Sequence, residues 1–181
     1  METYPLKCHP DTPAKLVSAI TASVIGWRDG WLELRWRIDG AGGLVLPAFA
    51  GKGRADGLWQ ATCFEAFLHP AGEAGYVELN LSPSERWAAY DFSSYRSGMA
   101  DRPVPRDPVC TMRRGQGGLA IFDAAIPLGA LPALPAQLSL TAVIEEQGGV
   151  KSYWALAHAP GQPDFHHAAC FAAMLAAPSA P

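Results

Sequence analysis

Several features that mark common functional classes are missing from this 181-residue chain. No uninterrupted apolar run approaches the roughly 18 residues that a membrane-spanning helix needs. The first residues have neither the basic start nor the apolar stretch of a secretory leader. The formal net charge is −3, which disfavours a phosphate-binding surface. We therefore expect a cytoplasmic protein that binds neither membranes nor nucleic acid.

Paired cysteines and catalytic motifs are also missing. Cys8, Cys63, Cys110 and Cys170 are spread singly along the chain, with no CxxC pair. This spacing disfavours a zinc site and predicts free, mostly buried thiols in a reducing compartment. The sequence contains no nucleophile elbow, phosphate-binding loop or HExxH motif. We therefore expect that the protein is not an enzyme.

The chain contains many short alternating runs separated by Gly, Pro, Asp and Ser clusters, and almost no helical periodicity. This pattern is typical of an all-β protein, and it predicts a β-sandwich or a β-barrel. We expect one domain over residues 1–181, with a core from about 16 to 171 and a frayed tail from 172 to 181. Long loops at 41–56 and 94–108 are expected at one end. The predicted strands are residues 16–25, 31–39, 58–68, 76–82, 86–92, 109–114, 118–126, 138–146 and 150–157.

Turn signals connect several of these strands. The pairs Asp29-Gly30 and Gly148-Gly149 predict tight turns between neighbouring strands. Residues 126–131 predict one short helical turn. The apolar, Ala-rich stretch at 168–175 fits either a short helix or a strand that docks on the sheet.

Polar side chains follow two of the predicted strands on one face. Residues 76–82 alternate without a break, and a strand projects alternate side chains to opposite faces. The apolar set belongs to the core, so Glu78 and Asn80 lie on the other face. If the apolar residues of 62–68 share that core, Glu65 lies on the same outer face as Glu78.

Two carboxyl groups and an amide beside aromatic rings can hydrogen-bond hydroxyl groups or hold a cation. The alternative is an ordinary outer face on which Glu65 and Glu78 pair with Arg86 or Arg96. An acid/base pair for glycoside hydrolysis is a further alternative, which no other motif supports.

Three segments carry a resemblance to a known family: LWQATCFEAFL, YVELNLSPSERWAAYDFSSYRSGM and SYWALAHAPGQPDFHHAACF. The chain resembles the bacterial DOMON-like proteins related to family 9 carbohydrate-binding modules, over about residues 31–171. The resemblance implies an immunoglobulin-like or jelly-roll β-sandwich whose concave sheet face or loop mouth holds a ligand, and this is the fold we expect. Characterised relatives bind sugars or b-type haem, and calcium stiffens a loop in carbohydrate modules of this kind. Many bacterial members have no assigned ligand.

The first choice is therefore non-catalytic binding of a small saccharide or sugar-like molecule. Sugar sites need an aromatic platform and a few hydrogen-bonding groups. We expect Trp87 and Tyr95 to stack on the sugar ring. The residues expected to hydrogen-bond its hydroxyl groups are Glu65, Glu78, Asn80 and Arg96.

Two other functions are kept open. A cytochrome-like module would bind haem b through Met99 with His158 or His166, since thioether and imidazole are common axial ligands. A protein-interaction module would use an exposed sheet edge. The segment 158–167 holds three His and one Asp, and fits either a metal site or a structural loop. The sequence predicts no oligomeric state.

Overall fold

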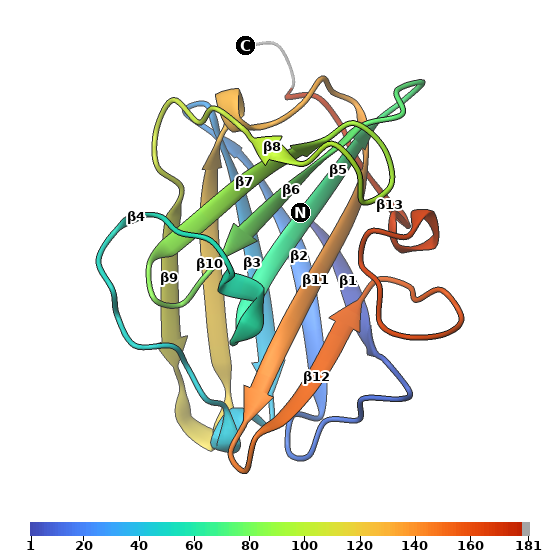
Figure 1. The fold of residues 1–181 in the computed structure, drawn as a ribbon. Coiled ribbons are helices and arrows are strands. Elements are labelled where there is room, and N and C mark those ends of the chain that lie inside the picture. The colour runs from blue at the N-terminus through green and yellow to red at the C-terminus, as the bar shows by residue number, and fades with distance from the viewer. Residues whose placement is uncertain (179–181) are drawn as a thin grey trace.

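The computed structural model describes residues 1–178, which form a nearly all-β fold (Figure 1). The strands are β1 Glu2–Cys8, β2 Ala19–Arg28, β3 Trp31–Asp39, β4 Gly53–Arg54, β5 Cys63–Pro70, β6 Tyr76–Leu81, β7 Arg86–Phe92, β8 Ala100–Asp101, β9 Val109–Arg114, β10 Ala120–Pro127, β11 Ala136–Glu146, β12 Val150–Ala155 and β13 Ala173–Leu175. Single 3₁₀ turns lie between them: η1 Ala41–Gly43, η2 Leu58–Gln60, η3 Gln116–Gly118, η4 Leu128–Ala130 and η5 Ala168–Cys170. Over residues 1–178, no helix has the length and apolarity to cross a bilayer.

The strands form one curled sheet in the order β4-β7-β6-β5-β11-β12-β1-β2-β3-β10-β9, while β8 pairs with β7 and β13 with β11. Strand β1 connects the two halves, because Glu2 to Leu6 pair with β2 while Lys7 and Cys8 pair with β12. In Figure 1 the half from β7 to β12 lies in front of the half from β2 to β9. The sheet is therefore folded back on itself.

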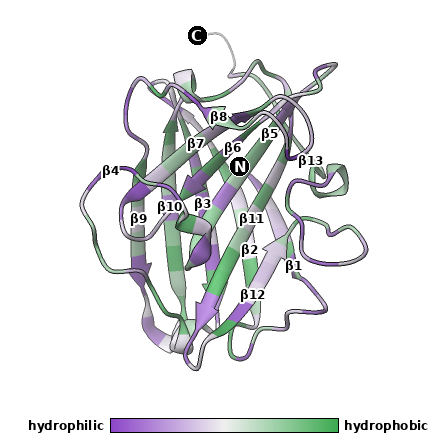
Figure 2. Cartoon of the chain, in the orientation of Figure 1, coloured by the Kyte–Doolittle hydropathy of each residue, from purple (hydrophilic) through white to green (hydrophobic). Residues whose placement is uncertain are grey.

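The main core fills the space between these two halves. The rings of Phe64 on β5 and Phe122 on β10 stack with centroids 4.2 Å apart, and Trp36 on β3 lies within 5.9 Å of both. All three side chains are fully buried. Figure 2 shows hydrophobic and hydrophilic positions following one another along single strands. This alternation lets each half bury one face and use the other differently.

Each of the nine predicted strands has a counterpart in the structure, with shifted ends. The strand expected over 58–68 begins only at Cys63, because the turn η2 precedes it. The predicted turn at Asp29-Gly30 is confirmed, with φ of 49° and 78° at the two residues. The short helical turn predicted within 126–131 is η4.

The prediction of a frayed tail over residues 172–181 is wrong for residues 173–175. Strand β13 pairs with β11, and Leu175 is 2% exposed, so residues 173–175 belong to the sheet. The last part of that prediction, residues 179–181, lies outside the described residues. Strand β1 also lies beyond the expected core. It contains Pro5, and Leu6 is its one buried residue, so it gives little alternation signal.

The all-β prediction is confirmed at the level of strand content and a curled sheet. The finer prediction, an immunoglobulin-like or jelly-roll sandwich, is not confirmed. A sandwich of that type has two sheets, whereas β1 here joins both halves into one continuous sheet.

Replacing Phe64 by Ala tests the contact between the halves. The variant loses the stacked ring of Phe122 and leaves a cavity in the core, so the free energy of unfolding should fall by about 3–5 kcal/mol. Urea unfolding measures the change. Phe49→Ala is the matched control, because Phe49 is 71% exposed and its loss should change stability by less than about 0.5 kcal/mol. Equal effects at the two positions would contradict this description of the core.

Candidate functional site

Strands β5 and β6 bring three of the predicted site residues together. Glu65 pairs directly with Asn80, and Phe67 pairs with Glu78. The apolar residues between them, such as Phe64 and Leu79, face the core. The predicted parity is therefore correct: Glu65, Glu78 and Asn80 share the outer face of the front half of the sheet.

This outer face is buried, although it lies away from the main core. Glu65 is 2% exposed, Glu78 7% and Asn80 1%. A second apolar cluster covers the same face, built mainly from Phe67, Tyr76, Tyr90, Phe92 and Phe165. Phe165 comes from the segment after β12, which lies over the sheet. The polar groups therefore lie in a low-dielectric environment.

A cavity of about 920 Å³ opens over this face. Strands β5, β6, β7, β11 and β12 contribute side chains to it, together with the β1–β2, β4–β5, β7–β8 and β12–β13 connections. Its aromatic lining consists of Trp59, Phe67, Tyr90, Phe92, Tyr153 and Phe165. Its titratable lining includes Asp56, Glu65, Glu78, Arg96, Asp101 and His166.

Glu65 and Glu78 form a buried carboxyl pair in this cavity. Thr141 donates a hydrogen bond to Glu65 Oε2 over 3.1 Å, and Asn80 Nδ2 donates one to Glu78 Oε1 over 2.9 Å. Burial raises the pKa of Glu65 well above its usual range, and the charge of Glu78 adds to this. Burial also raises the pKa of Glu78 to about 7, against the opposing effects of Asn80 and Arg96. The fold therefore favours the protonated forms of this pair.

His166 lies beside the pair. Its Nδ1 is 2.7 Å from the Tyr76 hydroxyl oxygen, and its Nε2 is 3.8 Å from Glu78 Oε2. Burial lowers the pKa of His166 to about 4; Arg96 acts in the same direction and Asp164 opposes it. The imidazole is therefore neutral at pH 7.

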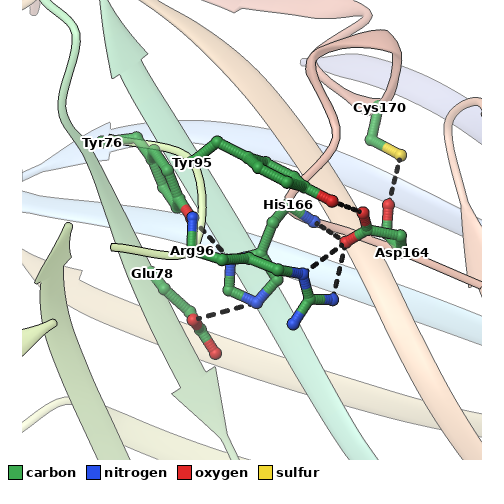
Figure 3. Close-up of polar contacts among 7 residues, drawn as sticks. All are labelled: Tyr76, Glu78, Tyr95, Arg96, Asp164, His166 and Cys170. Carbon is green, nitrogen blue, oxygen red and sulfur yellow. Dashed lines mark hydrogen bonds and ion pairs between the residues drawn. The ribbon is translucent and has the colours of Figure 1, made fainter. Parts of the chain in front are cut away.

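An ion pair between Arg96 and Asp164 links the β7–β8 connection to the β12–β13 connection (Figure 3). Arg96 Nε and Nη2 both donate to Asp164 Oδ1, over 3.2 and 2.7 Å. The Tyr95 hydroxyl donates to Asp164 Oδ2, and the Arg96 amide donates to Tyr76. Burial acts to raise the pKa of Asp164, but the hydrogen bonds from Tyr95 and Arg96 lower it below its usual value. We call the group Tyr95, Arg96 and Asp164 the clasp.

Neither residue predicted as an aromatic platform, Trp87 or Tyr95, lines the cavity that holds Glu65 and Glu78. Trp87 is a correction: it pairs with Leu81 across β6 and β7, is 4% exposed and lies in the main core. The guanidinium carbon Cζ of Arg54 lies over the Trp87 ring, 4.6 Å from its centroid. Tyr95 is 56% exposed but belongs to the clasp and does not line the main cavity.

Sequence reasoning missed Trp59 as a lining residue. Trp59 lies in η2 at the cavity and is 51% exposed. The sequence signal was a tryptophan two positions after Gly57, which takes a φ of 69° and redirects the chain before β5. Asp164 was predicted only as part of a metal or structural loop.

Of the three residues predicted as haem ligands, two line the cavity and one does not. Met99 and His166 line the cavity. His158 does not: its Nε2 is 2.8 Å from the Lys7 carbonyl oxygen, and its ring lies against His9. Over residues 1–178, no group of three or more His, Cys, Asp or Glu is arranged to hold a metal ion. The expected calcium site stays a prediction.

Replacing Glu78 by Gln should change how stability depends on pH. A pKa raised in the folded state stabilises the fold fully below about pH 4.5, and this contribution is lost as the pH rises through about 7. Glu78→Gln removes the ionising group, so it should gain stability relative to the parent protein between these pH values. Glu65 and His166 are present in both proteins, but burial and the charge of Glu78 together raise the pKa of Glu65. The difference therefore reports the carboxyl pair and not Glu78 alone.

Urea unfolding of both proteins at a series of pH values measures this difference. Glu33→Gln, which removes one carboxyl group from β3 in the other half of the sheet, is the charge-matched control. A stability difference for Glu78→Gln that does not vary with pH would contradict the described environment of Glu78.

Comparison with known proteins gives a structural match without a family. No protein-family model and no curated protein matches the sequence. Among solved structures, the chain is similar to a Bacteroides uniformis protein provisionally described as carbohydrate-binding. The two are 14% identical with a TM-score of 0.66, and the match covers 97% of this chain and 85% of the other. At this identity the likeness shows a shared fold.

Proposed function

We propose that this protein binds a carbohydrate or sugar-like small molecule in the cavity over β5, β6 and β7, without catalysing a reaction. One observation carries the proposal: buried hydrogen-bonding groups and aromatic side chains line the same cavity. Small-molecule sites commonly combine an apolar lining with a few convergent polar groups. Sugars need both, because they present hydroxyl groups at their edges and C–H groups on their faces.

Each lining group then has a role. Trp59 is half-exposed at the cavity and would stack on a sugar ring. Glu65 and Glu78 would accept hydrogen bonds from hydroxyl groups, and Asn80 would hold Glu78 in place through its amide. Arg96 would donate to the ligand from Nη1, while its Nε and Nη2 remain hydrogen-bonded to Asp164.

The resemblance to DOMON-like proteins and family 9 carbohydrate-binding modules supports the same ligand class. It depends on the three sequence segments and agrees with an all-β chain. The provisional description of the Bacteroides uniformis protein, a structural relative, points the same way.

Haem b binding is the second candidate, since Met99 and His166 line one cavity. His166 Nδ1 is engaged by Tyr76, so haem iron would bind at Nε2, which now faces Glu78. A saturable Soret band on hemin titration, lost in Met99→Ala, would replace the sugar proposal with this one.

Trp59 provides the test of the sugar proposal. The ligand panel contains three neutral sugars (glucose, galactose and mannose) and their 2-amino derivatives. Tryptophan fluorescence and calorimetry follow binding. Trp59→Ala should weaken the affinity of any sugar that binds by about tenfold, the value of an aromatic contact near 1.4 kcal/mol. Trp59→Phe should keep the affinity within a few-fold while removing most of the fluorescence change.

Trp31→Phe is the matched control, because Trp31 lies on β3 and contacts Arg106, outside the cavity lining. It should leave both affinity and the ligand-induced fluorescence change intact. The proposal fails if no sugar of the panel binds, or if Trp59→Ala binds as the parent protein does.

A further inference from the structure

We propose that the ligand of this cavity carries a protonated amine, which lies against the carboxyl groups of Glu65 and Glu78. The inference rests on the proposed function and narrows it: the sugar-like ligand is an amino sugar or a similarly aminated polyol. Four observations support it, taken in turn below.

The first observation is that, within residues 1–178, no Lys or Arg side chain contacts the carboxyl pair. The charge of Arg96 reaches Glu78 only through space, where it lowers the pKa of Glu78 against the larger effect of burial. The Arg96 guanidinium donates twice to Asp164. Within residues 1–178, no Lys or Arg nitrogen lies within 4.0 Å of a Glu65 or Glu78 carboxyl oxygen. The basic group beside Glu78 is His166, at 3.8 Å. Its imidazole is neutral at pH 7 because burial lowers its pKa to about 4.

The second observation is a set of acceptor atoms with free capacity. In the part of the chain that the structure describes, Glu65 Oε1 receives no hydrogen bond, and Glu78 Oε2 has only the 3.8 Å contact with His166. Glu65 is 2% exposed and lines the cavity. Asn80 Oδ1, buried beside both carboxyl groups, also lacks a partner. An ammonium group has three N–H donors and no acceptor, so it complements this set.

The third observation is the cost of the carboxyl pair in the absence of a cation. Burying carboxylates without a partner is unfavourable, and two of them on neighbouring strands repel each other. The empty site meets this cost by protonation, since the pKa of each carboxyl is raised. A ligand ammonium would instead stabilise the ionised pair. A neutral hydroxyl group brings one donor and no positive charge, so it does not stabilise the ionised pair in this way.

The fourth observation is the aromatic surround. Phe67, Phe92 and Phe165 line the same cavity as the carboxyl pair, and Phe67 is the direct cross-strand neighbour of Glu78. Aromatic faces attract cations through their quadrupole, most strongly where water is excluded. A cation between carboxyl groups and rings is therefore favoured by both.

The test compares ligands that differ only in the amine. Calorimetry at pH 7 measures glucosamine, galactosamine and mannosamine against glucose, galactose and mannose, with ethanolamine as an amine that is not a sugar. At least one amino sugar should bind ten or more times more tightly than its neutral counterpart, the effect of a charge-assisted hydrogen bond. This comparison uses the parent protein and needs no variant.

Variants then locate the amine. Glu65→Gln and Glu78→Gln keep the side-chain shape and remove the charge. Each should lower amino-sugar affinity by about tenfold or more, and by a clearly larger factor than it lowers neutral-sugar affinity. Glu33→Gln removes one charge from the other half of the sheet and should change neither. Circular dichroism checks that each variant is folded. If only one of the two Glu variants folds, that variant is enough for the test.

The outcomes separate this inference from the proposed function. Neutral sugars that bind as well as amino sugars would overturn the inference and leave sugar binding intact. Binding of ethanolamine with no sugar would overturn sugar binding and support the amine site. An amino-sugar affinity unchanged in both Glu variants would overturn the inference, and no binding by any member of the panel would overturn both.

Discussion

The pairing of β5 with β6 is the constraint on which the other features of this protein depend. In the observed register, Phe64 and Leu79 face the core while Glu65 and Glu78 face away from it. A slip of either strand by one residue would exchange that strand's two faces and put its carboxyl group into the main core. The cost of burying unpaired carboxyl groups there makes the alternative registers unfavourable. The same alternation that builds the core therefore also builds the candidate site.

The outer face of this half of the sheet is unusual because it is covered and not solvated. The β12–β13 connection brings Phe165 and His166 over it, and the clasp between Arg96 and Asp164 fixes that connection to the β7–β8 connection (Figure 3). Arg96 adopts a φ of 51° there, which is uncommon for a residue with a side chain. Perturbed carboxyl groups in a cavity are more typical of binding sites than of structural positions. The cover and the carboxyl pair thus form one structural unit, which is the candidate site.

Sequence reasoning predicted the features that depend on local pattern. Alternation located nine of the strands, and parity placed Glu65, Glu78 and Asn80 on one face. The same parity argument applied to β7 would have put Trp87 in the core, because it pairs with Leu81. The clasp could not be predicted, since Tyr95 and Arg96 are nearly 70 positions from Asp164 and no periodicity connects them. For residues 168–175 the sequence left a short helix and a docked strand open, and the structure has both: the turn η5 and the strand β13, which pairs with β11.

The most direct test of the account is carboxyl ¹³C NMR of protein labelled at its Glu side chains, with Glu65 and Glu78 assigned through their Gln variants. Saturation with the tightest-binding sugar of the panel should shift both resonances, because both carboxyl groups line the cavity. The remaining Glu resonances should stay in place. A sugar that saturates the protein and moves neither resonance would contradict the claim that this carboxyl pair is the binding site.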